Sequence, residues 1–205
     1  MKIGVLGGTF DPVQRGHIMV AESARDSLSL DCLLMVPAGQ PPFKGGEPVT
    51  PAEHRLAMLR LAVAGMTGVE VSTVEIERPG PSYTVDTIAA LRERYGDRDE
   101  IYFIVGWDSL GQFPGWREPE RILGMCKLAA VPRPGWERPD MRKVEKKLPG
   151  ISQRVVLLDK PHVDISASAV REMVADGKSI GSLVPGSVAE YIKEHSLYKK
   201  QGGTS

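Results

Sequence analysis

Short apolar runs typical of β-strands alternate with helical patterns from the start of the chain to Leu158. The expected strands are Lys2–Leu6, Cys32–Val36, Val69–Ser72, Ile101–Val105, Lys127–Val131 and Arg154–Leu158. The clearest helical patterns between them cover residues 17–28, 51–63, 83–95 and 118–125. Strands that alternate with helices form a parallel sheet covered on both faces. The sequence therefore predicts an α/β fold, a doubly wound Rossmann-like sheet that binds ligands at the carboxyl ends of its strands.

The last part of the chain has a different pattern. After Leu158 come two helical patterns, Ser166–Asp176 and Pro185–His195, without a strong strand. A chain of 205 residues suits one α/β domain with a sizeable core. We therefore expect a single domain over residues 1–200, with a helical C-terminal subregion at about 160–198 and a disordered tail at 201–205.

Composition excludes several classes of partner. The 26 Lys and Arg residues balance 26 Asp and Glu residues, so no overall basic field attracts nucleic acid. No apolar run reaches the roughly 18 residues that span a bilayer, and no charged-then-apolar leader precedes the first strand. Cys32 and Cys126 lie in apolar contexts without metal-ligand spacing. We expect a cytoplasmic protein without nucleic-acid or membrane partners.

The segment Gly7-Gly8-Thr9-Phe10-Asp11-Pro12-Val13, followed by Gly16-His17, joins the first strand to the first helix. Glycines let backbone N–H groups approach an anion closely, and a helix N-terminus adds partial positive charge. His17 can donate a further hydrogen bond at the same place. This layout predicts a phosphate site, and the expected ligand is a nucleotide.

A second anion site is predicted at Ile165-Ser166-Ala167-Ser168-Ala169-Val170-Arg171. Ser166 by itself reads equally well as an ordinary helix cap. Two hydroxyls at a helix start, with the donor fork of Arg171 beyond them, also suit phosphate oxygens. Together with the glycine segment, this motif favours a triphosphate held between two helix N-termini.

Three other segments have less direct interpretations. The loop Pro37–Pro48 is rich in Pro and Gly and carries Lys44, which makes it a candidate lid. Thr50-Pro51-Ala52-Glu53 has the pattern of a helix capping box, with Thr50 as the N-cap. The scattered histidines have no spaced ligand partners, so we expect no metal site built from protein ligands. These histidines are His54, His162 and His195.

Several of these motifs together resemble bacterial nicotinate-nucleotide adenylyltransferase, a family of the nucleotidyltransferase superfamily. The glycine segment and the Ile-Ser-x-Ser-x-x-Arg motif are shared across the superfamily and indicate only the reaction class. Further matches are Pro-Ala-Gly-Gln-Pro-Pro from Pro37, residues 78–87, Gly106-x-Asp108 and residues 131–135. Of the motifs, the Pro-Gly-Pro-Ser-Tyr-Thr stretch at residues 79–84 and the downstream Trp116 are narrower and point to the pyridine-nucleotide branch. The resemblance covers residues 2 to about 198.

The resemblance implies a transfer of the adenylyl group from ATP to nicotinate mononucleotide, with Mg²⁺ carried by ATP and Asp108 as its candidate contact. It implies His17, Lys44 and Arg171 as the catalytic residues. The implied ATP contacts are Gly7, Gly8, Thr9, Phe10, Gln14, His17, Gly106, Asp108, Arg133, Ile165, Ser166, Ser168 and Arg171. The implied mononucleotide contacts are Thr9, Lys44, Ser82, Tyr83, Thr84 and Trp116.

Two positions depart from the family pattern: Gln14 stands where relatives usually carry His or Thr, and Phe43 where many carry His. Gln14 keeps an N–H donor but cannot be cationic, so we expect weaker phosphate stabilisation or an altered pose. Three alternatives stay open: transfer to nicotinamide mononucleotide, transfer to pantetheine phosphate, and a nucleotide sensor without catalysis. Chain length and Trp116 disfavour pantetheine phosphate. The sequence is compatible with a monomer or a homodimer.

Overall fold

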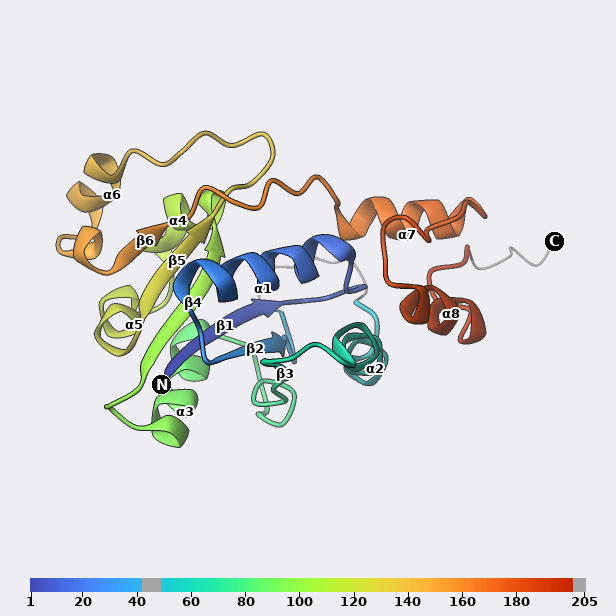
Figure 1. Ribbon diagram of the computed structural model, residues 1–205, viewed down its shortest axis with the longest axis horizontal. Coiled ribbons are helices and arrows are strands. Elements are labelled where there is room, and N and C mark those ends of the chain that lie inside the picture. The colour runs from blue at the N-terminus through green and yellow to red at the C-terminus, as the bar shows by residue number, and fades with distance from the viewer. Residues whose placement is uncertain (42–48, 201–205) are drawn as a thin grey trace.

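The computed structural model describes residues 1–41 and 49–200, and six strands form one parallel sheet within them (Figure 1). These strands are β1 (Lys2–Gly8), β2 (Cys32–Pro37), β3 (Val69–Val71), β4 (Glu100–Gly106), β5 (Lys127–Val131) and β6 (Val155–Leu157). Their order is β3-β2-β1-β4-β5-β6, and each neighbouring pair is parallel. All six predicted strands and the doubly wound fold are confirmed. The strand order reverses between β1 and β4, which is where such sheets bind ligands.

Six predicted helices also form, with ends shifted by one or two residues. They are α1 (Arg15–Leu28), α2 (Ala52–Val63), α3 (Thr84–Tyr95), α5 (Pro119–Met125), α7 (Ala167–Ala175) and α8 (Gly186–Glu194). Two more helices, α4 (Trp107–Gln112) and α6 (Met141–Lys147), were not predicted. With six and seven residues they are too short to show a helical period in the sequence.

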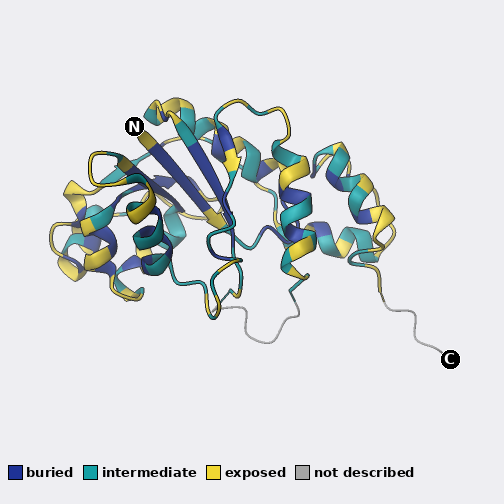
Figure 2. Ribbon diagram, turned by 90° about the horizontal axis from the view of Figure 1, so that it is seen from below, coloured by how far each residue is buried: buried dark blue, intermediate teal, exposed yellow. Residues whose placement is uncertain are grey.

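The sheet separates two cores, and the alternation of strand residues assigns each side chain to one of them. In β1, Ile3 and Val5 pack on the face that carries α3 and α5, whereas Leu6 packs on the face that carries α1. Successive strand residues point to opposite faces, so a strand buried on both sides is apolar throughout. Figure 2 shows this as dark strands inside a shell of partly exposed helices.

The C-terminal helices lie beyond the carboxyl end of β1 rather than over the sheet (Figure 1). α8 packs against α2 and buries Val188 and Ile192. This placement leaves the N-terminus of α7 close to the loop between β1 and α1, because Arg171 of α7 donates a hydrogen bond to the Asp11 carbonyl at 2.9 Å. The predicted tail, residues 201–205, lies outside the described residues.

The predicted capping box at the start of α2 is wrong. The helix begins at Ala52 with Pro51 as its N-cap, and no side chain caps it. The backbone N–H of Thr50 instead donates to the Asp11 carboxylate at 3.2 Å. A tertiary contact thus replaces the local one that the pattern indicated.

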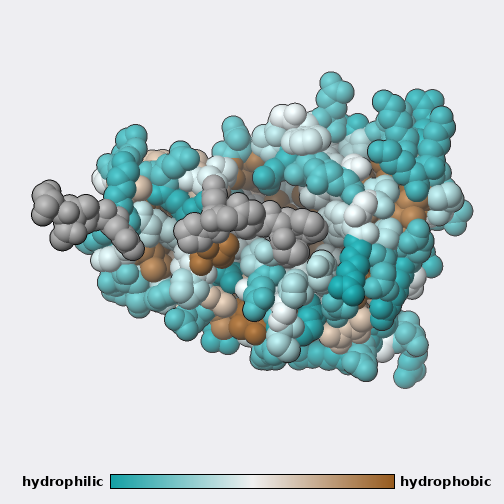
Figure 3. Space-filling view, turned by 180° about the vertical axis from the view of Figure 1, so that it is seen from behind, coloured by the Kyte–Doolittle hydropathy of each residue, from teal (hydrophilic) through white to brown (hydrophobic). Residues whose placement is uncertain are grey.

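Where atoms are coloured in Figure 3, the hydrophobic ones form small separate patches among hydrophilic ones. Of the helices in residues 1–41 and 49–200, none combines the length and apolar character needed to cross a bilayer.

Candidate active site

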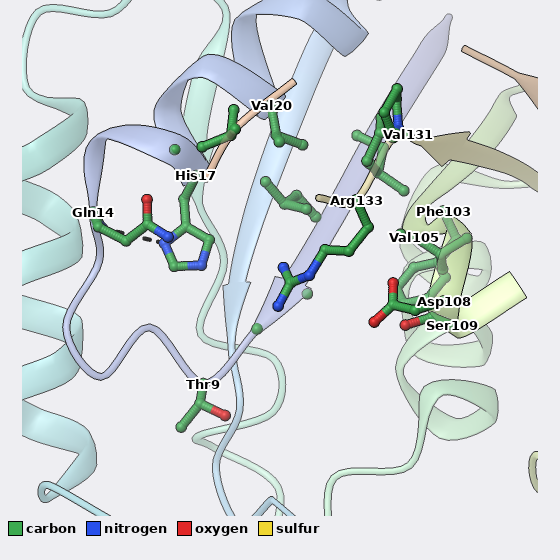
Figure 4. A pocket seen from close by; sticks show the side chains of 18 of the residues that line it. Thr9, Gln14, His17, Val20, Phe103, Val105, Asp108, Ser109, Val131 and Arg133 are labelled. Carbon is green, nitrogen blue, oxygen red and sulfur yellow. Dashed lines mark hydrogen bonds between the residues drawn. The ribbon is translucent and has the colours of Figure 1, made fainter. Parts of the chain in front are cut away.

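A cavity of about 480 Å³ opens at the switch point of the sheet, between the carboxyl ends of β1, β4 and β5. Its volume is in the range of small-molecule sites. Ten predicted site residues line it: Gly7, Gly8, Thr9, Gln14, His17, Gly106, Asp108, Trp116, Arg133 and Ile165. Gln14 and His17 lie on one side in Figure 4, Asp108 on the other, and the Arg133 guanidinium extends between them. The side chains of His17 and Arg133, which can donate hydrogen bonds, therefore face the same space as the Asp108 carboxylate.

His17 is held as a neutral hydrogen-bond donor. Burial, and next the positive charge of Arg133, lower the pKa of His17 to about 4. Its Nδ1 accepts the backbone N–H of Gln14 at 3.2 Å, which leaves the proton of the neutral ring on Nε2. The ring also packs edge to face on Phe10, with the centroids 4.9 Å apart. Phe10 itself is buried and does not line the cavity; it orients His17.

Gly106 ends β4 directly before the short helix α4 that carries Asp108. A Cβ at this position would collide with the Asp108 carboxylate. Glycine is therefore needed for the carboxylate to fold back over the strand end. Asp108 is the only carboxylate among the described residues that line the cavity.

Gln14 connects the two predicted phosphate motifs. Its side chain is 5% exposed, and its Nε2 donates to the carbonyl of Ile165 at 2.7 Å. Ile165 precedes Ser166, the N-cap of α7, whose hydroxyl accepts the N–H of Ala169 at 3.1 Å. One N–H of the Gln14 amide is thus taken by the protein, a role that the sequence did not suggest.

The rest of the second motif lies near the cavity without lining it. Among the described residues, Ser166, Ser168 and Arg171 are absent from the lining. The Arg171 guanidinium donates to the Asp11 carbonyl at 2.9 Å and to the Ser168 hydroxyl at 3.3 Å. The motif therefore contacts the loop between β1 and α1, as a site built from both chain regions requires.

Trp116 and Phe103 form the aromatic wall of the cavity. Trp116 meets Phe103 edge to face at 6.2 Å and Phe113 at a tilt at 5.2 Å, measured between ring centroids. Two ring contacts thus fix the indole.

The predicted mononucleotide contacts Ser82, Tyr83 and Thr84 do not line the cavity in the described part of the chain. The Ser82 hydroxyl accepts the N–H groups of Gly39 and Gln40 at 3.0 and 3.3 Å. Thr84 begins α3, and the Arg117 guanidinium lies 4.6 Å above the Tyr83 ring. The segment is therefore held between the end of β2 and the residue after Trp116.

A buried polar network supports the loop between β1 and α1, and sequence reasoning missed it. Arg55 on α2 is 1% exposed and donates to three carbonyls, those of Thr50, Thr9 and Gly39, at 2.8, 2.9 and 3.3 Å. Burial lowers the pKa of Arg55. The only sequence signal is that Arg55 lies on the same helical face as the buried Met58 and Leu59.

Asp11 is the second centre of this network and is 2% exposed. Its carboxylate accepts the Tyr198 hydroxyl at 2.7 Å and the Thr50 N–H at 3.2 Å. Burial, and next the charge of Asp11, raise the pKa of Tyr198. The C-terminal segment after α8 is therefore tied to the N-terminal glycine segment.

The comparisons with known proteins identify the family of the chain. The cytidylyltransferase-like family model matches residues 5–173. A relative from Dehalococcoides mccartyi, named "Probable nicotinate-nucleotide adenylyltransferase", is 44% identical over 98% of this chain and 98% of its own. One of the same name from Thermomicrobium roseum is 45% identical over 97% of this chain and 92% of its own. The chain belongs to the nicotinate-nucleotide adenylyltransferase family.

Solved structures show the same fold at low identity. The Plasmodium falciparum nicotinic acid mononucleotide adenylyltransferase, in complexes with APC and with NaAD, superimposes with a TM-score of 0.77. Identity is 19%, and the match covers 96% of this chain and 96–97% of the other. The chain therefore shares the fold of these structures over nearly its whole length.

Two positions of the family pattern fall in residues 42–48. Lys44, predicted as a catalytic residue, and Phe43, the second departure from the family pattern, lie outside the described residues. Among the residues that the structure does describe, no group of three or more His, Cys, Asp or Glu side chains is arranged to hold a metal.

Proposed function

We propose that this protein transfers the adenylyl group of ATP to nicotinate mononucleotide, releasing pyrophosphate and forming the deamido dinucleotide of NAD biosynthesis. The observation that carries the proposal is the neutral His17 donor, with its Nε2–H available at the switch-point cavity of a sheet whose family performs this reaction.

The reaction needs positioning more than proton transfer. The phosphate of the mononucleotide is already largely ionised at neutral pH, because its second pKa is about 6, and it can attack the α-phosphorus of ATP in line. His17 would donate to an oxygen of the ATP polyphosphate, and Arg133 would neutralise charge in the same space. Donors aimed at developing charge lower the barrier without a general base.

Magnesium enters this scheme as part of the ATP substrate. Mg²⁺ keeps several waters and binds through one or two carboxylates together with substrate phosphates. Asp108, the one carboxylate among the described lining residues, fits that mode. In the part of the chain that the structure describes, no cage of ligands is arranged for a resident ion.

The remaining groups divide between the two substrates. Ser166, Ser168 and Arg171 would hold the β- and γ-phosphates, and Gly106 would meet the adenosine ribose. The flat indole of Trp116 suits a cationic pyridinium, and backbone donors of the Tyr83–Thr84 segment suit the carboxylate. Lys44 would act on the transferring or leaving group.

Pyrophosphate release tests the proposal, with ATP and Mg²⁺ plus nicotinate mononucleotide, nicotinamide mononucleotide or pantetheine phosphate in separate reactions. We expect the highest kcat/KM with nicotinate mononucleotide. Equal or faster turnover with the amide would favour the first alternative. ATP binding without pyrophosphate release from any acceptor would favour the sensor.

A further inference from the structure

We propose that Gln14 is a positioning residue that joins the N-termini of α1 and α7 into one polyphosphate site. The inference rests on the proposed use of ATP but assigns Gln14 a role in assembly of the site rather than in contact with phosphate. The relevant bond runs from Gln14 Nε2 to the Ile165 carbonyl at 2.7 Å and spans 151 residues of sequence.

Two hydrogen bonds cross in opposite directions between the motifs. The Gln14 side chain reaches from the N-terminal motif to the backbone of the C-terminal one. The Arg171 guanidinium reaches from the C-terminal motif to the Asp11 carbonyl at 2.9 Å. Each side chain thus fixes the backbone that carries the other, which sets the distance between the two helix starts.

Packing adds to these bonds. A Cβ on Gly16 would collide with both Gln14 Oε1 and Val163, so the Gln14 amide and the segment before Ser166 lie directly on the first turn of α1. The Gln14 side chain also faces the backbone N–H of His17, in a capping-box arrangement at the start of α1. The Nε2 hydrogen bond to Ile165 and the packing on Gly16 therefore hold the Gln14 amide in place. The amide fits there because position 16 has no side chain.

The same residue also sets the state of His17. The backbone N–H of Gln14 donates to His17 Nδ1 at 3.2 Å, which places the ring proton on Nε2. Gln14 thus orients the His17 donor through its backbone N–H and positions the start of α7 through its side chain. Preassembly of both halves reduces the ordering that ATP binding would otherwise have to supply.

Gln14→Met tests the assignment, because methionine keeps the length of the side chain and removes the donor. The dissociation constant of MgATP, measured by calorimetry without mononucleotide, should rise on the order of tenfold, which corresponds to the loss of one buried hydrogen bond. KM for ATP should rise in parallel, while kcat and KM for the mononucleotide change little. Gln14→His keeps a donor and should recover most of the affinity.

Arg15→Met is the matched control. Arg15 is the exposed neighbour of Gln14 and also links α1 to the C-terminal region, through the Gly181 carbonyl at 3.4 Å, but it does not touch Ile165. It should leave MgATP affinity unchanged. The inference is wrong if Gln14→Met binds MgATP like the parent, if it lowers kcat instead, or if Arg15→Met weakens MgATP equally. Absence of turnover in the parent would overturn the proposed function, and the calorimetric comparison would still decide the role of Gln14.

Discussion

At the scale of single residues, His17 serves the site as a neutral donor. Burial and the charge of Arg133 lower its pKa to about 4, and the Gln14 N–H occupies Nδ1. A donor that is already oriented needs little reorganisation when negative charge develops in front of it. The residue is thus suited to a transition state with more charge on the phosphates than the ground state has.

Replacing His17 with Ala should lower kcat about 100-fold, as the loss of one oriented donor usually does. Pyrophosphate release measures the effect, and unchanged circular dichroism would show that the fold persists. His162→Ala, at an exposed histidine, serves as the control and should keep full turnover. If His17→Ala kept a near-normal kcat, His17 would have only a structural role at the start of α1.

The pKa of His17 predicts a dependence of stability on pH. The folded pKa of about 4 lies below the unfolded value of about 6.5, so the unfolded chain binds more protons between these values. The free energy of unfolding should therefore fall as the pH drops from about 6.5 to about 4. Urea titrations at several pH values should give a shallower decline for His17→Ala than for the parent.

Proton NMR of the histidine ring checks the same prediction directly in the folded protein. The resonance that disappears in His17→Ala should titrate with a midpoint of about 4 and remain that of a neutral ring at pH 6. A midpoint at the ordinary histidine value of about 6.5 would contradict the neutral-donor account.

At the scale of elements, α2 holds two loops in place through the side chain of Arg55. Arg55 binds the carbonyl of Thr9, directly after β1, and the carbonyls of Gly39 and Thr50, both in the connection between β2 and α2. A guanidinium has five donors in a fixed plane, so it can join several backbone groups at once. The glycine segment thus depends on a helix that contributes nothing to the cavity lining.

Arg55→Met should lower the free energy of unfolding by about 3 kcal/mol, because three buried carbonyls lose their donor. Urea denaturation measures this loss. Arg60→Met is the matched control, since Arg60 lies on the exposed face of the same helix, and it should stay within about 0.5 kcal/mol of the parent. Equal stability of both variants would show that the carbonyls find other donors.

At the scale of the whole molecule, the site joins parts of the chain that are far apart in sequence. The loop between β1 and α1 receives Arg171 from α7 and Tyr198 from the segment after α8. The backbone N–H of Arg15 also donates to the Leu183 carbonyl at 2.8 Å. The C-terminal region therefore supports the loop between β1 and α1.

Tyr198→Phe should lower the free energy of unfolding by about 1–2 kcal/mol, because the buried Asp11 carboxylate loses a hydrogen-bond donor. Thermal and urea denaturation measure the change. Tyr95→Phe is a suitable control, because no described residue is hydrogen-bonded to the Tyr95 hydroxyl. If Tyr198→Phe were as stable as this control, the Tyr198 hydroxyl would not stabilise the loop between β1 and α1.

Much of the architecture was predictable because its causes are local. Apolar runs and helical periods located all six strands and six helices, and glycine beside a helix start indicated the loop between β1 and α1 that lines the cavity. Local patterns failed at Thr50, where a contact with Asp11 replaced the capping box, and in α4 and α6, which are too short to show a period. The patterns also could not show that Gln14, a departure from the family, would bind Ile165.

The sequence alone determined the succession of all six strands and of six helices along the chain, the reaction class and ten of the residues that line the cavity. Each of these depends on the pattern of neighbouring residues. Only the tertiary structure decided the burial of Arg55, the proton position on His17, and the meeting of Asp11 with Tyr198. These features depend on contacts between distant segments and on the water that the contacts exclude. Removal of water lowered the pKa of His17, and long-range hydrogen bonds brought the two phosphate motifs together.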